Sequence, residues 1–555
     1  ILKIKVMIQK TSQIVRFFVL LLLSFIINMK NKILIIVLCI LNCAASYSQS
    51  PNILLIIADD LGVDALNGYN IGSFKPTTPH LDSIRNSGIT FSNAWASTVC
   101  APTRAGIMSG MYGSNNGVKT LPGNLDTTYT SLLNALKNST PIYTAAVIGK
   151  WHISNPTNGL HPIWHGVDHY MGILQGAVMS YDNWNKTENN ITTNSTDYIT
   201  SYLTDDAINW IDNQNNPWFL WLAHVAPHTP LHIPPANMYT QPSTNSQMKK
   251  YMAMIESLDY EVGRLLNSLT PTEKANTTII FIGDNGTPNN LLQDYPANHG
   301  KTTLYQGGIH VPMFVSGYGV TRIGETENAL VNVIDIYASI LEISGTNLPG
   351  GIFNSLSFKH LLSTSILPKR QFNFSEIDTN GTSLTTQGFT IRDSAYKLIE
   401  YYTGQQEMFN LINDPLETNN LLQGTLTTNE QNLKSELENE ANQRITAWSC
   451  KDDIQNGNEQ GIDCGGTYCL PCSTTSTNES IISNSISVYP NPAKNTLHIK
   501  GNKNIDHVRI IDKLGKVIKA EMTSKNTINI EALKQGAYLI EILCEDKVII
   551  KKFIK

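Results

Sequence analysis

The side chains best able to do chemistry stand in a Cys-x-Pro-x-Arg pattern that runs from Cys100 to Arg104. An apolar, strand-like run from Ile89 to Ala96 precedes the pattern, and the residues after it can continue as a helix. A turn from strand to helix presents its first polar side chain and several free backbone N–H groups to a ligand, which suits an anion. A lone cysteine is more often a small buried hydrophobe, so the interpretation of Cys100 depends on the other polar motifs.

Followed by a small, Gly-containing helical start, this pattern resembles the signature of the type I sulfatases, a family in which the cysteine is oxidised to formylglycine. Five further segments resemble motifs of that family, in the family's order: Asp59-Asp60-Leu61-Gly62 after an apolar strand, Gly149-Lys150-Trp151-His152, Pro227-His228-Thr229-Pro230, Asp284-Asn285-Gly286 and His299-Gly300-Lys301. These motifs lie between Pro51 and Pro312, and the resemblance extends to about Trp448. One departure follows, because the family reads Glu-Gly-Gly-x-Arg where this chain reads Gln306 to His310. We expect it near the rim of the active site, where it would bear on substrate preference.

The resemblance implies one calcium ion, bound by Asp59, Asp60, Asp284, Asn285 and the modified side chain of Cys100. The acidic and amide side chains of this set offer only oxygen atoms, which select a hard cation, calcium before magnesium, and give zinc little advantage. Three carboxylates, one divalent ion and the cations Arg104, Lys150 and Lys301 would leave the pocket positive by about two units. Such a pocket attracts sulfate.

The resemblance also implies six catalytic residues: Cys100, Arg104, Lys150, His152, His228 and Lys301. In the implied mechanism, one hydroxyl of a hydrated formylglycine at position 100 attacks sulfur and expels the alcohol, and the second hydroxyl helps to eject sulfate. His152 orients or deprotonates this diol, which Arg104 and Lys150 hold. His228 and Lys301 bind the sulfate, and one of the two protonates the leaving oxygen.

Unbroken apolar runs separated by helical patterns predict an α/β fold with a mostly parallel sheet sandwiched by helices. The expected strands are 52–58, 143–148, 218–223, 278–282 and 311–316, and the expected helices are 78–87, 131–137, 196–214, 248–269 and 331–344. The polar motifs fall at strand ends, and open α/β sheets bind ligands at the carboxyl ends of their strands. The family resemblance implies that this fold is alkaline-phosphatase-like.

Five parts are expected along the chain. They are an upstream extension and signal peptide over 1–50, a catalytic α/β domain over 51–345, a small antiparallel C-terminal subdomain over 346–448, a Cys-rich segment and linker over 449–485, and a β-sandwich over 486–555. With its Tyr-Pro-Asn-Pro opening at Tyr489 and its lysine-rich end, the last part resembles the C-terminal sorting domain of the type IX secretion system. A glycan-binding module is the alternative for this part.

The composition bears on compartment and partners. A net charge of −5 over 555 residues creates no basic field for nucleic acid. The basic, apolar and small-residue stretches between Met29, the expected true start, and Ser50 are typical of a secretory signal, so we expect a secreted or cell-surface protein. In an exported chain, two disulfides are favoured over half a zinc site for the cysteine cluster Cys450, Cys464, Cys469 and Cys472.

Two other groups of residues are set aside. Histidines recur every four residues at His161, His165 and His169 and again at His224, His228 and His232. Prolines and a glycine interrupt both runs, so we expect no helical zinc site. Stacking on sugar rings is an alternative to core packing for Trp151, Trp164, Trp184 and Trp221.

Together these features predict a secreted hydrolase of sulfate monoesters, acting on a sulfated polysaccharide or oligosaccharide. Its expected partners are that glycan, a formylglycine-generating maturation enzyme and the type IX secretion machinery. Phosphonate or phosphodiester hydrolysis stays open, because phosphoryl and sulfuryl transfer need similar clamps. A non-catalytic protein that binds sulfated glycans is the alternative from another class, favoured if Cys100 stays a thiol.

Overall fold

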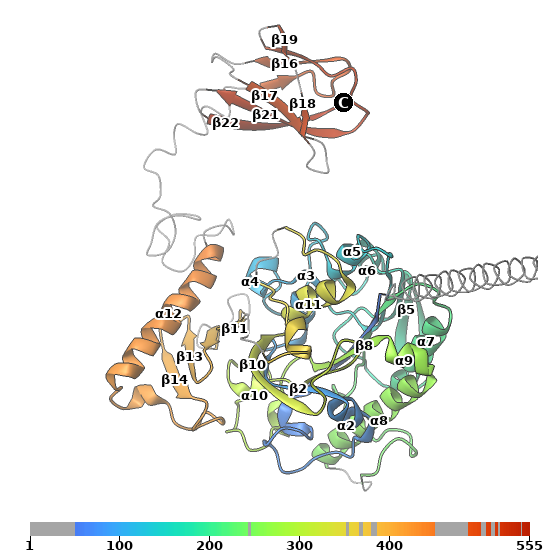
Figure 1. Cartoon of the computed structure of the whole chain (residues 1–555), viewed down its shortest axis with the longest axis vertical. Coiled ribbons are helices and arrows are strands. Elements are labelled where there is room, and N and C mark those ends of the chain that lie inside the picture. The colour runs from blue at the N-terminus through green and yellow to red at the C-terminus, as the bar shows by residue number, and fades with distance from the viewer. Residues whose placement is uncertain are drawn as a thin grey trace, which may run out of the picture. The chain divides into compact units, whose positions relative to one another are not determined.

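The computed structural model describes residues 50–241, 246–350, 354–365, 370–378, 386–449, 487–500, 507–511, 517–519, 522–524, 526–544 and 547–555 (Figure 1). The chain divides into two compact units, residues 1–445 and 446–555, and each is described by itself. The predicted signal peptide and the four clustered cysteines lie outside the described residues. None of the helices in the described part of the chain has the length and apolar character needed to cross a membrane.

A ten-stranded mixed sheet forms the centre of the first unit. From edge to edge its strands are β10 (Glu325–Asn332), β2 (Gly88–Trp95), β9 (Met313–Gly317), β8 (Thr277–Gly283), β1 (Asn52–Ala58), β7 (Trp218–Ala223), β3 (Thr144–Lys150), β4 (His169–Ile173), β5 (Trp184–Glu188) and β6 (Ile191–Ser195). Across the sheet, the neighbouring strands β8, β1, β7, β3 and β4 pair in parallel, and so do β10 and β2. The strand β9 runs antiparallel between β8 and β2, and β5 and β6 extend the other edge antiparallel. The α/β prediction is therefore confirmed, with more antiparallel pairing than expected.

Both faces of the sheet are buried, because alternate residues of β1 enter different cores. Ile53, Leu55 and Ile57 pack on one face beneath α3 (Cys100–Ser109), α5 (Leu132–Leu136) and α11 (Asp335–Ser344). The residues between them pack on the other face beneath α2 (Pro79–Asn86), α7 (Ile199–Asp212) and α8 (Gln247–Ser268). A strand covered on both faces has no polar side, which explains its unbroken apolar sequence.

Shorter helices connect these elements: η1 (Val63–Ala65), α4 (Gly113–Asn116), α6 (His161–Trp164), α9 (Pro271–Ala275), η2 (Asn289–Leu291), α10 (Gln306–Ile309), η3 (Lys359–Leu362) and η4 (Leu421–Gln423). One sequence expectation is wrong at its start. The helix expected from Val331 begins only at Asp335, because the apolar residues up to Asn332 complete the edge strand β10. Short apolar runs do not distinguish a strand from a helix by periodicity.

A small antiparallel sheet follows in the same unit. Its strands are β11 (Asn373–Ile377), β12 (Gly388–Arg392), β13 (Tyr396–Tyr401) and β14 (Gln406–Asn410). The helix α12 (Thr428–Ser449) lies along this sheet (Figure 1), with Leu437 and Ala441 packed in a core with Leu398 and Met408. This arrangement agrees with the antiparallel subdomain expected from the sequence.

The second unit contains two four-stranded antiparallel sheets. One is formed by β15 (Ser487–Tyr489), β16 (Thr496–Lys500), β20 (Thr527–Asn529) and β19 (Met522–Ser524), and the other by β18 (Val517–Lys519), β17 (His507–Ile511), β21 (Ala537–Cys544) and β22 (Lys547–Ile554). Side chains of both sheets, among them Leu497, Ile528, Ile510 and Ile540, share one apolar core. The unit is therefore a β-sandwich, as expected from the sequence.

Candidate active site

Four parallel strands bring the polar motifs to one edge of the central sheet. Ala58, the last residue of β1, pairs with Gly283 of β8, and Ile57 pairs with Ala223 of β7, which also pairs with Gly149 of β3. The residues that follow these strand ends therefore lie side by side. They include the predicted Asp59, Asp60, Lys150, His152, His228, Asp284 and Asn285.

Main-chain and side-chain hydrogen bonds fix the acidic residues. Asp60 adopts a left-handed conformation with φ of 66°, and its N–H donates to Oδ1 of Asp284 at 3.1 Å. The hydroxyl of Tyr251 on α8 donates to the carbonyl oxygen of Asp60 at 2.7 Å, and Asn285 donates from Nδ2 to Oδ1 of Asp60 at 2.9 Å. A left-handed backbone is strained for any residue with a side chain. These bonds hold the strained conformation and aim the carboxylates into the site.

Each carboxylate has its own cation. Lys150 Nζ lies 2.5 Å from Oδ2 of Asp59, and Lys301 Nζ lies 2.5 Å from Oδ1 of Asp60. The third cation, Arg104, donates from Nε and Nη2 to Oδ2 of Asp284 at 3.1 and 2.7 Å and from Nη1 to the carbonyl of Lys150 at 2.6 Å. Five of these side chains are almost fully buried and that of Lys301 largely so, so the pairing is needed to offset the cost of removing the charges from water.

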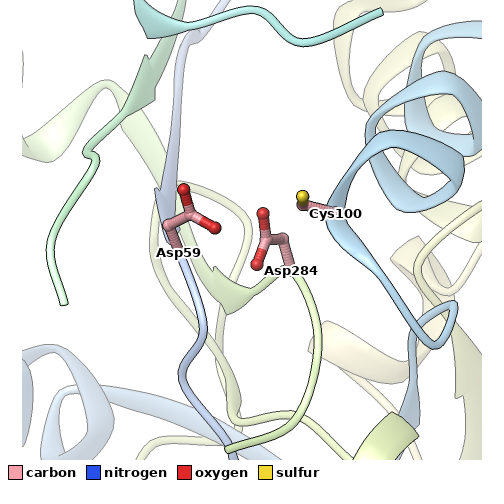
Figure 2. Close-up of side chains that lie close together, drawn as sticks. All are labelled: Asp59, Cys100 and Asp284. Carbon is pink, nitrogen blue, oxygen red and sulfur yellow. The ribbon is translucent and has the colours of Figure 1, made fainter. Parts of the chain in front are cut away.

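Cys100 is the first residue of α3 and lies beside this charged set. Its side chain points toward the carboxylates of Asp59 and Asp284, as Figure 2 shows, and the residue is 1 % exposed. Its Sγ lies 3.2 Å from Nδ1 of His152, which also has a left-handed backbone, with φ of 56°. A side chain on Gly176 would collide with the His152 ring, since an added Cβ would lie 2.4 Å from it.

His228 approaches the site from the loop after β7. Its Nε2 lies 3.8 Å from Oδ2 of Asp60, and its Nδ1 lies 2.8 Å from the carbonyl oxygen of Thr229. A carbonyl only accepts, so Nδ1 carries a proton and a neutral His228 presents a bare Nε2. The hydroxyl of Tyr181 donates to the main-chain carbonyl of His228 at 2.7 Å, which fixes the segment.

The buried charges shift the pKa values of the carboxyl groups in opposite directions. Burial alone would raise the pKa of Asp59, but Lys150, His228 and Arg104 lower it well below its usual range. Burial and the neighbouring charge of Asp59 raise the pKa of Asp284 to about 6, although Arg104 acts in the opposite direction. Asp59 therefore stays ionised across the physiological pH range.

The thiol and its imidazole neighbour are both neutral. Burial raises the pKa of the Cys100 thiol, and burial together with Lys150 and Arg104 lowers the pKa of His152 to about 2. Reactive cysteines have the opposite property, a lowered pKa that favours the thiolate. An unmodified Cys100 is thus a poor nucleophile, whereas a neutral His152 can accept a proton.

The donor atoms suit a hard cation. One oxygen each of Asp59 and Asp284 and the Sγ of Cys100 lie within 4.8 Å of one another, and the same holds for Asp59, Asp60 and His228. Within the described residues, Oδ1 of Asp59 and Oδ1 of Asn285 are buried without a hydrogen-bond partner. Buried oxygen atoms that lack a donor are the atoms expected to bind a cation.

The departure from the family pattern lies in the interior, not at a solvent-exposed rim. Gln306 and His310 are 4 % and 7 % exposed. The side-chain oxygen of Gln306 accepts from the indole of Trp95 at 2.8 Å, and the main-chain N–H of Gln306 donates to the carboxylate of Glu417 at 2.5 Å. Glu417 in turn pairs with Lys397 of β13 at 2.5 Å. These residues therefore link the small sheet to the strand that precedes Cys100.

The remaining histidines and tryptophans are mostly structural. His161 accepts from the Trp151 indole at 3.1 Å and contacts the carbonyl of Leu125 at 2.9 Å, and His165 packs against both rings. The third member of this run, His169, contacts Asp206 at 2.7 Å. Of the four tryptophans considered for sugar stacking, Trp151, Trp184 and Trp221 are buried and Trp164 is 51 % exposed.

Three supporting residues were missed by sequence reasoning. Tyr251 and Tyr181 orient the main chain of two site segments, and Gly176 makes room for the His152 ring. Tyr251 lies in an apolar helical pattern that indicates only core packing, and Tyr181 lies in a polar segment, so the sequence contains no local signal for their hydroxyl contacts. Gly176 is one of 37 glycines and could not be singled out.

Comparison with known proteins gives three matches to family models. Residues 51–346 match the sulfatase model, residues 297–445 match the model of the C-terminal part of N-sulphoglucosamine sulphohydrolase, and residues 487–555 match the secretion system C-terminal sorting domain. The sorting domain is the one expected from the sequence, so that prediction is confirmed.

Relatives and solved structures agree with these matches. N-acetylgalactosamine-6-sulfatase of Homo sapiens is 27% identical over 344 residues, covering 55% of this chain and 64% of that protein. The uncharacterized sulfatase YdeN of Escherichia coli (strain K12) is 29% identical over 367 residues, with the same two shares. The chain thus spans just under two thirds of the length of these relatives.

The fold is also found among solved structures. The crystal structure of Ps i-CgsB in complex with k-i-k-neocarrahexaose has a TM-score of 0.60 at 25% identity, over 71% of this chain and 92% of that chain. The expected alkaline-phosphatase-like architecture is therefore confirmed. Because the sulfatase model matches residues 51–346 of 555, more than half of the sequence, the chain belongs to the sulfatase family.

Proposed function

We propose that this protein hydrolyses sulfate monoesters of a sulfated glycan, with Cys100 converted to formylglycine and one calcium ion in the site. The observation that supports this most directly is the convergence of Asp59, Asp284 and Cys100 within 4.8 Å at the start of α3. The names of the relatives, an N-acetylgalactosamine-6-sulfatase and a protein crystallised with a neocarrahexaose, favour a sugar as the carrier of the sulfate.

The state of the thiol supports the conversion. Burial raises the pKa of the Cys100 thiol, and Asp59 and Asp284 act in the same direction although Lys150 and Lys301 oppose them, so the reactive thiolate is disfavoured. A hydrated formylglycine would supply an oxygen nucleophile and a second hydroxyl able to expel sulfate, and the cation would neutralise the ester and favour the alkoxide. The residues around position 100 would then act on oxygen rather than sulfur.

The ligand set proposed for calcium is Asp59, Asp60, Asp284, Asn285 and the oxygen at position 100. The unpartnered Oδ1 atoms of Asp59 and Asn285 support this choice, since both are buried and face no donor within the described chain. All four side chains offer oxygen, and none offers the nitrogen or sulfur that zinc prefers.

The other residues divide into two groups by position. His152 lies against Cys100 at 3.2 Å and is neutral, so it can accept the proton of the diol, while Arg104 and Lys150 hold the carboxylates around it. His228 and Lys301 lie beside Asp60, and we assign them to binding of the sulfate. Asp60 raises the pKa of Lys301 although burial opposes it, so Lys301 keeps its proton, and we assign protonation of the leaving oxygen to His228.

Turnover of an aryl sulfate by the wild type and by Cys100→Ala tests the proposal. The wild type should release the phenol, and the variant should lose at least about 10³-fold in kcat with an unchanged melting temperature, because it lacks the nucleophile. The matched control is His165→Asn, which changes a buried residue away from position 100. Retained turnover in Cys100→Ala would reject the assignment.

The alternatives are separated by the same assay. Both esters fit one charged clamp, so the relative rates separate the two hypotheses. A phosphonate or phosphodiester hydrolase would turn over an aryl phosphodiester faster than an aryl sulfate. A protein that only binds sulfated glycans would turn over neither and would contain an unmodified thiol at position 100. We expect the aryl sulfate to be preferred.

Export is proposed from the second unit. Residues 487–555 match a secretion system sorting domain and fold as a separate β-sandwich. We infer that the protein is carried by the type IX machinery to the cell surface or the medium, where sulfated glycans would be met. Deletion of residues 487–555 in the native host should retain the protein inside the cell envelope, and undiminished release would contradict the inference.

A further inference from the structure

Outside the catalytic residues, the ammonium group of Lys75 lies within a ring of main-chain carbonyl groups. Its Nζ donates to the carbonyl oxygens of Asp64, Leu66 and Ile71 at 2.9, 2.8 and 2.5 Å, and the carbonyl of Val63 lies at 3.4 Å. All four groups belong to the loop between β1 and α2. An ammonium group has three donors and no acceptor, so this ring surrounds it as carbonyl oxygens surround a metal ion.

The loop must fold back on itself to form the ring. Gly72 has φ of 83°, and a Cβ there would lie 1.9 Å from the carbonyl oxygen of Asp64, so only glycine fits. Converging carbonyl dipoles repel one another, and a cation at their centre offsets that repulsion. The positive charge of Lys75 therefore sits where the closed loop needs one.

Hydrogen bonds connect the ring to the active site. The carboxylate of Asp64 accepts from the Thr287 hydroxyl at 2.5 Å and from the Gln293 N–H at 2.9 Å. The Thr287 hydroxyl also accepts from the N–H of Gly62 at 3.2 Å, and the Thr287 carbonyl accepts from the N–H of Lys301 at 2.9 Å. The loop after Asp60 and the loop that carries Lys301 are thus joined through Asp64 and Thr287.

We propose that Lys75 is a tethered cation that occupies a cation site of its own chain, closes the 63–71 loop, and so positions Lys301 through Asp64 and Thr287. Lys75 is a positioning residue in this account and touches no substrate. Burial lowers the pKa of Lys75, to about 8, and Asp64 and Asp294 oppose this change. The carbonyl groups bind the ammonium form more strongly than the neutral amine, because the ammonium has three charge-assisted donors, so they act in the same direction as the two carboxylates.

Chemical rescue of Lys75→Met tests the proposal. Methionine keeps an apolar stem and removes the charge, so the melting temperature should fall by about 2–4 °C. Ammonium chloride should restore most of that loss, because a free ammonium ion can enter the vacated ring. Tetramethylammonium chloride at the same ionic strength should restore none, since it has no N–H donor. The matched control Lys274→Met removes an exposed lysine. Its melting temperature should equal that of the wild type, and ammonium chloride should not raise it further than in the wild type.

Two results would overturn the proposal: a loss in Lys75→Met no larger than that in Lys274→Met, or equal rescue by the two salts. If Lys75→Met does not fold, limited acetylation of the wild type decides the matter. Lys75 should then react at least about tenfold more slowly than Lys274, and equal rates would contradict the ring. The link to turnover rests on the proposed function, and ammonium should raise the kcat of Lys75→Met in parallel with its melting temperature. The thermal and acetylation results hold even if the protein hydrolyses no sulfate.

Discussion

The ammonium nitrogen of Lys150 lies 2.5 Å from Oδ2 of Asp59, with both side chains fully buried. The guanidinium of Arg104 pairs with the buried carboxylate of Asp284, and Lys301 pairs with that of Asp60. An isolated buried charge costs several kcal/mol, so the protein folds this centre as matched pairs. A divalent cation would turn the balanced set positive by two units, which favours an anionic ester.

Replacement of Arg104 by alanine should destabilise the protein by roughly 3–5 kcal/mol, because it leaves Asp284 buried without its cation. Lys137→Ala is the matched control, since Lys137 pairs with Asp168 at the surface and should cost less than about 1 kcal/mol. Equilibrium unfolding in urea measures both. Equal losses would show that the buried pairing adds nothing to stability.

Removal of divalent ions should lower the melting temperature and abolish turnover, and calcium should restore both. A ligand at a hundredfold excess over its Kd stabilises the folded state by about 2.7 kcal/mol. Zinc should restore neither, since Asp59, Asp60, Asp284 and Asn285 offer only oxygen. Thermal scans of chelator-treated protein with each ion check this. A melting temperature that is insensitive to chelation would argue against the metal site.

Tyr251→Phe should weaken calcium binding although Tyr251 is no ligand. The variant leaves the carbonyl of Asp60 without its donor, which costs about 1–3 kcal/mol and releases the strained backbone. Tyr337→Phe loses a similar bond, to the carbonyl of Thr130, on the other face of the sheet. Calcium titrations followed by melting temperature should shift to higher concentration in Tyr251→Phe and stay unchanged in Tyr337→Phe. An identical pair of titrations would exclude the orienting role.

The stability of the protein should depend on the ionisation of Asp259. This carboxyl accepts from the N–H groups of Leu81 and His80 at the start of α2, and burial raises its pKa to about 7. Because the folded pKa exceeds the unfolded value of about 4, protonation of Asp259 favours the folded state. This contribution to the free energy of unfolding is complete below about pH 4 and is lost as the pH rises through about 7. Melting temperatures of wild type and Asp259→Asn should therefore diverge in slope between about pH 4 and about pH 7. Parallel slopes would contradict the shift.

Motifs at strand ends could be predicted from the sequence because two simple rules operate there. Buried parallel strands have continuous apolar sequences, and their carboxyl ends meet at one edge, so Asp59, Lys150 and Asp284 could be brought together without coordinates. Short alternating runs separated by turn residues predicted the antiparallel subdomain and the β-sandwich. The sequence pattern predicted too early a start for the helix that begins at Asp335, because apolar residues of an edge strand and of a helix look alike locally.

The pairing within the site could not be predicted, because it depends on contacts between residues far apart in the chain. Nothing near Lys75 indicates that four carbonyl groups would surround its ammonium group, since main-chain atoms are the same at every position. The burial of Gln306 could not be predicted for a related reason. Its side chain is satisfied by Trp95 and its N–H by Glu417, both distant in sequence, and these partners draw it into the interior.

The mass of the tryptic peptide that ends at Arg104, taken from protein made in the native host, tests the central claim most directly. Conversion of Cys100 to formylglycine replaces sulfur by a lighter aldehyde oxygen, so the peptide should be lighter than its sequence predicts and should react with a carbonyl reagent. A peptide of unmodified mass that reacts with a thiol reagent instead, in protein that turns over an aryl sulfate, would contradict the proposed nucleophile.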